Sequence, residues 1–137
     1  MMILTLRILI VIVLLFLLTL CSNINQVQSK VDVTGKYRDQ TENLTVELRQ
    51  KEQQVTGTHC FVIQEGKRID CCLSDEGASL KLKLDKQNIF TGIMTSCYDE
   101  ESRNINILAI DNQLMLIIKE NGHPFLPDTI LLTRLPK

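Results

Sequence analysis

The strongest constraint on the fold comes from residues 57–72, GTHCFVIQEGKRIDCC, in which ten residues separate one cysteine from two adjacent cysteines. Glu65-Gly66 lies between them as a turn signal for a β-hairpin. A two-residue turn there puts Cys60 opposite Cys71. The same register puts Val62 opposite Ile69 on one face, so the apolar pattern agrees with it. A three-residue turn would instead make Cys72 the partner of Cys60. We expect the first register.

The four cysteines beyond the N-terminal segment are even in number, which favours two disulfides in an oxidising compartment. Cys71 and Cys72 are neighbours whose side chains point in opposite directions in a strand, so they are poorly placed to join each other. The hairpin register pairs Cys60 with Cys71. Cys72 then faces the other side of the hairpin and pairs with Cys97.

The N-terminal residues indicate export. Arg7 precedes the apolar run 8–18, which is shorter than the roughly 20 residues of a membrane-spanning helix and resembles the helical core of a signal peptide. We expect residues 1–29 to be the signal and residues 30–137 to form a single disulfide-linked β domain. Two alternatives remain open: a lipoprotein signal ending at residue 20 with lipid on Cys21, and an uncleaved anchor. All three predict a domain outside the cytosol, periplasmic or secreted.

Hydrophobic residues in the domain alternate with polar ones. Leu44, Val46 and Leu48 alternate with Thr45, Glu47 and Arg49, as in strands with one buried face. No segment beyond the signal has a sustained helical period. We predict strands at 33–39, 43–50, 55–64, 68–73, 79–84, 89–97, 104–110, 113–119 and 129–134. The fold class is therefore all-β, an antiparallel meander of eight or nine strands that closes into a small barrel. A two-sheet sandwich is the alternative.

Two connections are long enough to bind a partner. Residues 98–103 carry three consecutive acids, and residues 120–128 contain two prolines and a glycine. Loops on a rigid sheet often carry recognition, although a solvated acidic turn and a proline-stiffened crossover would produce the same sequences. The candidate contact residues are Tyr98, Asp99, Glu100, Glu101, Arg103, Asn121, His123 and Phe125.

The composition and the motifs argue against several functions. Without Arg7 the chain has 14 basic and 16 acidic residues, so no basic excess indicates binding to nucleic acid, and contact with a membrane is expected only through the signal or a lipid anchor. His59 and Cys60 point to opposite strand faces, which disfavours a zinc site. No nucleophile motif accompanies His59 or His123, and no Cys-x-x-Cys motif is present. We predict no enzymatic activity, cofactor or metal.

Two resemblances add to these predictions. The segments Gly35-Lys36-Tyr37, Leu44-Thr45-Val46 and Val55-Thr56-Gly57-Thr58-His59 resemble the first hairpins of avidin-type barrels, which implies a secreted eight-stranded barrel. Avidins bind biotin between aromatic walls, whereas this chain has no Trp and has His59 at an aromatic position of the pattern. The segments Gly57–Val62 and Gly66–Cys71 also resemble a motif of small exported bacterial proteins of unassigned function.

These observations favour an exported, non-enzymatic protein that binds another protein, as inhibitors and immunity proteins of this size and compartment do. The alternative is a carrier of a small apolar ligand inside the barrel. Five aromatic residues beyond the signal are few for a ligand-stacking pocket, so the carrier is the second hypothesis.

Overall fold

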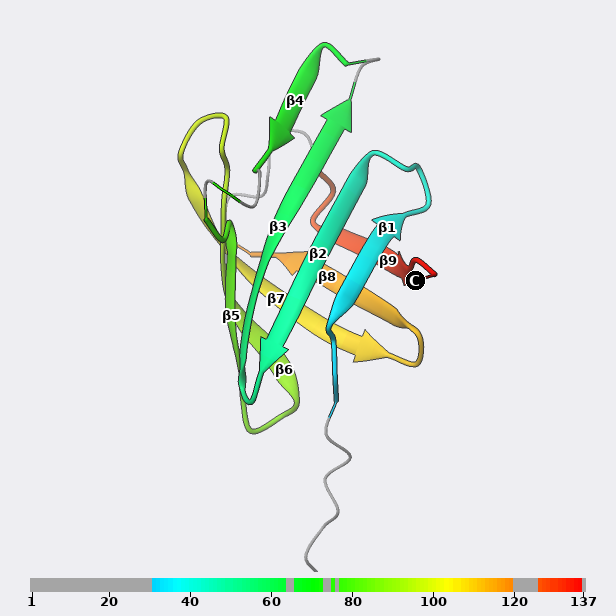
Figure 1. Ribbon diagram of the computed structural model, residues 1–137, viewed down its shortest axis with the longest axis vertical. Helices are drawn as coiled ribbons and strands as arrows, with labels where there is room; N and C mark the ends of the chain where they lie inside the picture. The colour runs from blue at the N-terminus through cyan, green and yellow to red at the C-terminus, as the bar shows by residue number, and fades with distance from the viewer. Residues whose placement is uncertain (1–30, 64–65, 73–74, 76, 120–125, 137) are drawn as a thin grey trace, which may run out of the picture. The chain divides into compact units, whose positions relative to one another are not determined.

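The computed structural model of the protein describes residues 31–63, 66–72, 75, 77–119 and 126–136. The expected signal helix, its cleavage site and Cys21 lie outside the described residues. The described chain forms nine strands, and each lies where the sequence predicts one, with ends that differ by at most two residues. They are β1 (Gly35–Asp39), β2 (Leu44–Lys51), β3 (Gln54–Ile63), β4 (Arg68–Cys71), β5 (Leu80–Leu84), β6 (Ile89–Thr95), β7 (Ser102–Ile110), β8 (Gln113–Ile118) and β9 (Thr129–Arg134) (Figure 1).

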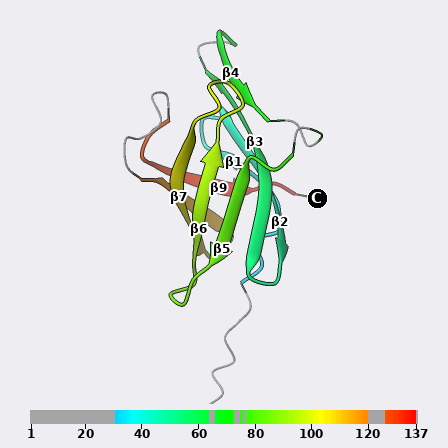
Figure 2. The ribbon, with the colours of Figure 1, turned by 90° about the vertical axis from the view of Figure 1, so that its left-hand side faces the viewer.

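Eight of these strands close into an antiparallel barrel, which confirms the barrel over the two-sheet sandwich. The strand order is β2-β1-β9-β8-β7-β6-β5-β3, and a further β2–β3 pairing closes the ring. Closure gives every strand of the ring two neighbours and so removes exposed edges. β4 is the ninth strand, outside the ring, and pairs with the far end of β3 (Figures 1 and 2).

The alternating pattern fills the barrel interior. Leu44, Val46 and Leu48 of β2 are buried, and the intervening polar residues point outward. Inward residues of the other strands, such as Leu80 and Ile107, complete one hydrophobic core. Burial of each large aliphatic side chain contributes about 1.5–3 kcal/mol to folding, and this core is the main stabilising feature. No helix in the described part of the chain is long and apolar enough to cross a membrane.

Two strand glycines allow neighbouring strands to approach closely. A Cβ at Gly57 would lie 2.3 Å from the carbonyl oxygen of Glu47, and one at Gly92 would lie 2.0 Å from that of Lys81. Both glycines occupy inward positions of the pleat, opposite buried Leu48 and Ile105, and a strand glycine often marks a close approach of two backbones. A side chain at either position would force the strands apart.

The β3–β4 hairpin has the predicted register. Cys60 pairs with Cys71 and Val62 with Ile69, and the disulfides are Cys60–Cys71 and Cys72–Cys97, as the sequence predicts. The face that carries Val62 and Ile69 lies on the outside, however, and Ile69 is 53% exposed. The apolar pattern on this face therefore does not mark the core.

The buried face of the hairpin is the other one. It carries His59, Phe61, Asp70 and Cys72, all of which are buried. The hairpin thus turns two titratable side chains toward the end of the barrel. Their surroundings define the candidate site.

Candidate functional site

A cleft of about 240 Å³ lies at the end of the barrel where β4 extends beyond the ring. One wall comes from the β3–β4 hairpin and the other from the loop between β6 and β7, at the same end of the barrel (Figures 1 and 2). The Cys72–Cys97 disulfide links the two walls. The hairpin contributes Phe61, Lys67, Arg68, Ile69 and Asp70, and the loop contributes Ser96, Tyr98 and Asp99.

The β6–β7 loop is held by hydrogen bonds to its own side chains. The Ser96 hydroxyl oxygen accepts the backbone N–H groups of Tyr98 (3.1 Å) and Asp99 (3.2 Å). The Ser96 N–H donates to the Glu101 carbonyl at 2.9 Å, and the Glu101 N–H donates to the Asp99 carboxylate at 3.0 Å. The loop therefore has a defined conformation from which the Tyr98 side chain, 76% exposed, extends into solvent.

A buried arginine lies at the base of this loop. The Arg103 guanidinium, 8% exposed, donates to Asp99 at 3.2 Å and to Glu101 at 2.8 Å. The backbone N–H of Glu101 and the guanidinium of Arg103 lower the pKa of Asp99 to about 2, against an opposing effect of burial. Two of the three consecutive acids, Asp99 and Glu101, therefore lie against a buried cation.

A polar cluster lies beneath the cleft. His59 Nδ1 lies 2.8 Å from the Ser79 hydroxyl, and His59 Nε2 lies 3.3 Å from an Asp70 carboxylate oxygen. The other Asp70 oxygen accepts the Cys97 N–H at 2.8 Å. Burial alone would raise the pKa of Asp70, but the hydrogen bond from Ser96 and the charge of His59 lower it below its ordinary value. The carboxylate is thus ionised and connects the hairpin to the loop.

His59 lies between Ser79 and Asp70 in space, as the histidine does in a Ser-His-Asp catalytic triad. The serine, however, is not placed to act as a nucleophile. Ser79 is 5% exposed and does not line the cleft. Its hydroxyl oxygen also accepts the backbone N–H of His59 at 3.2 Å. The hydroxyl is therefore engaged inside the structure rather than presented to a substrate.

Three of these side chains carry metal-ligand atoms. One such atom from each of His59, Asp70 and Cys72 lies within 4.8 Å of the others. Because the Cys72 sulfur is bonded to Cys97, it is no thiolate in the oxidised protein, and zinc sites use cysteine as the thiolate. We interpret the cluster as a structural polar network.

The predicted contact residues separate into three groups. Tyr98, Asp99, Glu100 and Glu101 lie on the exposed β6–β7 loop. Arg103 belongs to β7 and is buried. Asn121, His123 and Phe125 lie outside the described residues.

Sequence reasoning missed the members of the site that come from the hairpin. Phe61 and Asp70 line the cleft, and His59 contacts Asp70 from below. The register itself contained the signal, because it pairs Phe61 with Asp70 on the face opposite to Val62 and Ile69.

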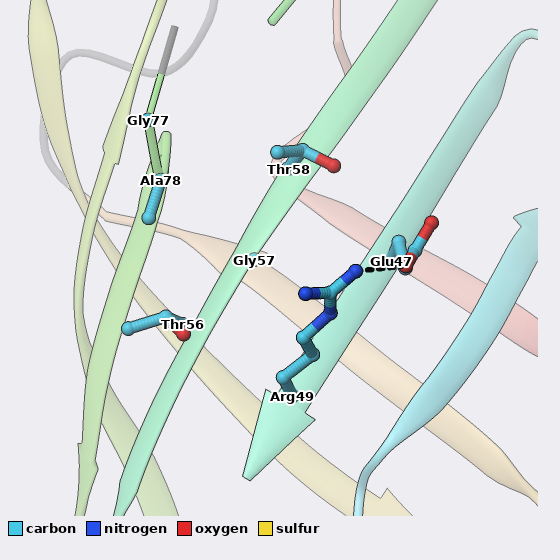
Figure 3. Close-up of a pocket in the computed structure, with 7 residues that line it drawn as sticks. All are labelled: Glu47, Arg49, Thr56, Gly57, Thr58, Gly77 and Ala78. Atoms are coloured by element: carbon cyan, nitrogen blue, oxygen red, sulfur yellow. Dashed lines mark hydrogen bonds and ion pairs between the residues drawn. The ribbon is translucent and has the colours of Figure 1, made fainter. Parts of the chain in front are cut away.

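A second, smaller hollow of about 130 Å³ lies on the outer surface of the barrel (Figure 3). It forms over Gly57, between Thr56 and Thr58 of β3 and the Arg49–Glu47 ion pair of β2, whose closest atoms are 3.3 Å apart. Both charged side chains are well exposed, and exposed pairs of this kind contribute little energy. The cleft beside β4 is the stronger candidate, because buried groups and a disulfide shape it.

Comparison with known protein families, with curated proteins and with solved structures found no match. The resemblance to avidin-type barrels therefore stays a prediction. The two disulfides are consistent with folding in an oxidising, extracytoplasmic compartment.

Proposed function

We propose that this protein is an exported, non-enzymatic binding protein that acts on another protein outside the cytosol, as an inhibitor or immunity-type protein does. The disulfides support an oxidising compartment, and the N-terminal apolar run in the sequence supports export. The cleft beside β4 supports the binding role. Its walls carry the exposed side chains of Ile69 and Tyr98, whereas the carboxylates of Asp70 and Asp99 already accept hydrogen bonds inside the protein.

The observation that carries the proposal is the position of Tyr98. A large aromatic side chain that is 76% exposed lies on a loop fixed by Ser96 and by the Cys72–Cys97 disulfide. Exposed Ile69 lies on the other wall of the same cleft. Aromatic residues dominate binding energy at protein interfaces, and a loop that is already ordered loses little entropy on binding.

Photo-crosslinking tests this proposal. A benzophenone amino acid replaces Tyr98 in one variant and Gln87 in a control variant. Gln87 is exposed in the β5–β6 turn, at the opposite end of the barrel (Figures 1 and 2). The proposal predicts one defined protein adduct from position 98 in cells or medium of the source organism, and none from position 87. Equal labelling from both positions, or no adduct at 98, would contradict it.

The carrier hypothesis has less support from the structure. A carrier needs an internal cavity, but the middle of the barrel is filled by core side chains such as Leu48, Leu80, Ile107 and Leu116, each at most 1% exposed. Native mass spectrometry distinguishes the two hypotheses. A small molecule retained in stoichiometric amount would favour the carrier.

A further inference from the structure

One edge of β4 is unpaired within the described part of the chain. Among the strands of the described residues, β4 pairs only with β3, while each strand of the ring has two neighbours. The Cys72 N–H donates to the His59 carbonyl on β3. Because antiparallel strands alternate the direction of their backbone groups, residues 68, 70 and 72 direct theirs toward β3. The backbone N–H and C=O groups of Ile69 and Cys71 therefore point to the open side.

An extended segment beside β4 would meet this open side. An antiparallel guest strand would have one residue opposite Ile69 and another opposite Cys71, and each pair would exchange two hydrogen bonds. Main-chain bonds of this kind supply affinity in strand-addition complexes, and pockets for alternate side chains supply specificity. The four backbone groups of Ile69 and Cys71 are enough for a two-pair ladder.

The cleft lies where the guest needs a pocket. Directly opposed residues on neighbouring strands project their side chains to the same face. A guest residue opposite Asp70 would therefore point to the face that carries Phe61, toward the cleft that Phe61, Tyr98 and Asp70 line. Asp70 and Asp99 already accept hydrogen bonds inside the protein, so the apolar groups remain to receive an apolar guest side chain.

The positive charges beside the cleft indicate which residue type is favoured at the next inward-facing position of the guest strand. Arg68 lies two residues before Asp70 and projects to the same face of β4. In an antiparallel guest, the residue opposite Arg68 comes two positions after the residue opposite Asp70. Opposite charges across strands are favourable, and Lys67 adds a second cation at this end of the cleft.

We propose that the open edge of β4 binds an extended segment of the partner protein as an added antiparallel strand, with an apolar guest side chain in the cleft and an acidic one two residues later opposite Arg68. This inference rests on the proposed function and specifies how the partner is recognised. The recognition element is a short apolar-x-acidic sequence in an extended segment.

A matched pair of variants tests the role of the backbone. Ile69→Pro removes the outward N–H of residue 69 and leaves the pairing with β3 intact, as proline does where the N–H of an edge strand faces solvent. Ile69→Ala removes the side chain but keeps that N–H. The far-ultraviolet circular dichroism and the disulfide map of both variants should match those of the wild type, which shows that both fold.

The probe is a library of random heptapeptides displayed on phage, selected on the oxidised wild-type domain and followed by synthesis of the selected peptides. The proposal predicts enrichment of apolar-x-acidic sequences. These peptides should bind Ile69→Pro at least about tenfold more weakly than Ile69→Ala, the scale of one lost hydrogen bond. N-methylation of the guest residues opposite Ile69 and Cys71 should abolish binding, whereas N-methylation of the residue between them should have little effect.

Several results would overturn the inference. One is that no peptide is enriched, and another is that the selected peptides bind Ile69→Pro and Ile69→Ala equally. A third is a wild-type dimer in sedimentation that Ile69→Pro converts to a monomer, because the edge would then pair with a second copy. If the Tyr98 adduct forms and is insensitive to Ile69→Pro, the inference fails while the proposed function stands. If peptides bind as predicted but position 98 captures no protein, the proposed function fails instead.

Discussion

Removal of the Asp70 carboxylate should destabilise the end of the barrel that carries the cleft. Asp70 is 6% exposed and has three partners: the Cys97 N–H at 2.8 Å, His59 Nε2 at 3.3 Å and the Ser96 hydroxyl. Asp70→Ala leaves all three without their acceptor. Removal of an acceptor that leaves buried donors unsatisfied costs about 1–3 kcal/mol, and more where the lost acceptor is charged. We therefore expect Asp70→Ala to lower the free energy of unfolding by about that amount at pH 7.

Asp70→Asn is the matched control. The amide oxygen still accepts the Cys97 N–H, and the amide NH₂ group can donate to His59 Nε2 in the tautomer that carries its proton on Nδ1. Only the charge is lost, so we expect a smaller cost of about 1–2 kcal/mol. Urea unfolding followed by circular dichroism measures both values.

The pH dependence gives a second readout. The pKa of Asp70 is lower in the folded protein than its ordinary value of 3.8. Its contribution to stability is therefore fully present above that ordinary value and is lost as the pH falls through the lower folded-state pKa. The difference between wild type and Asp70→Asn should shrink as the pH is lowered below about 3.8. A cost below about 1 kcal/mol for Asp70→Ala, or a difference that does not change with pH, would refute the role of Asp70.

Three further predictions follow from single features. Gly57→Ala places a Cβ 2.3 Å from the Glu47 carbonyl oxygen and should lower the free energy of unfolding by about 1–3 kcal/mol, whereas Thr56→Ala on the outer face serves as a control; equal stability of the two variants would contradict the close approach of the strands. The double variant Cys72→Ala/Cys97→Ala removes a disulfide with a sequence separation of 25 and should lower the free energy of unfolding, measured in urea, by about 3–4 kcal/mol. Cys60→Ala/Cys71→Ala removes one with a separation of 11 and should lower it by less; the reverse order would contradict an explanation by loop-closure entropy. Tyr98→Ala removes an exposed side chain and should change stability by less than about 0.5 kcal/mol while lowering recovery of the partner in pull-downs; a large loss of stability would show that Tyr98 acts in folding.

The strands and their pairing were predictable from local sequence. β2 and β5 alternate cleanly between leucine or valine and polar residues, and a short turn at Glu65-Gly66 is enough to determine the hairpin register. Closure of the barrel followed from the need to remove edges. For these elements, local chemistry and overall fold agree.

The site was less predictable, because the two faces of the β3–β4 hairpin have similar apolar content. Val62 and Ile69 look like a core face, yet His59 and Asp70 are buried on the other one. The two side chains are buried together, with His59 Nε2 and an Asp70 oxygen 3.3 Å apart, and the other Asp70 oxygen accepts the Cys97 N–H. The alternation of apolar and polar residues along the sequence does not show such contacts between side chains on different strands.

Arg103 was misplaced for a different reason. Strand β7 begins two residues earlier than its apolar run indicates, so Arg103 was assigned to the exposed loop. Its position alternates in step with buried Ile105 and Ile107, and its charge is balanced there by Asp99 and Glu101.

Amide hydrogen exchange at β4 tests the binding account most directly. In the free protein the outward N–H groups of Ile69 and Cys71 should exchange rapidly, while the Asp70 N–H, directed at β3, should be protected. In complex with a selected peptide or the cross-linked partner, Ile69 and Cys71 should become protected. If protection appears only elsewhere, for example in the β5–β6 turn, and the amides of Ile69 and Cys71 still exchange rapidly, the β4 edge is not the binding site.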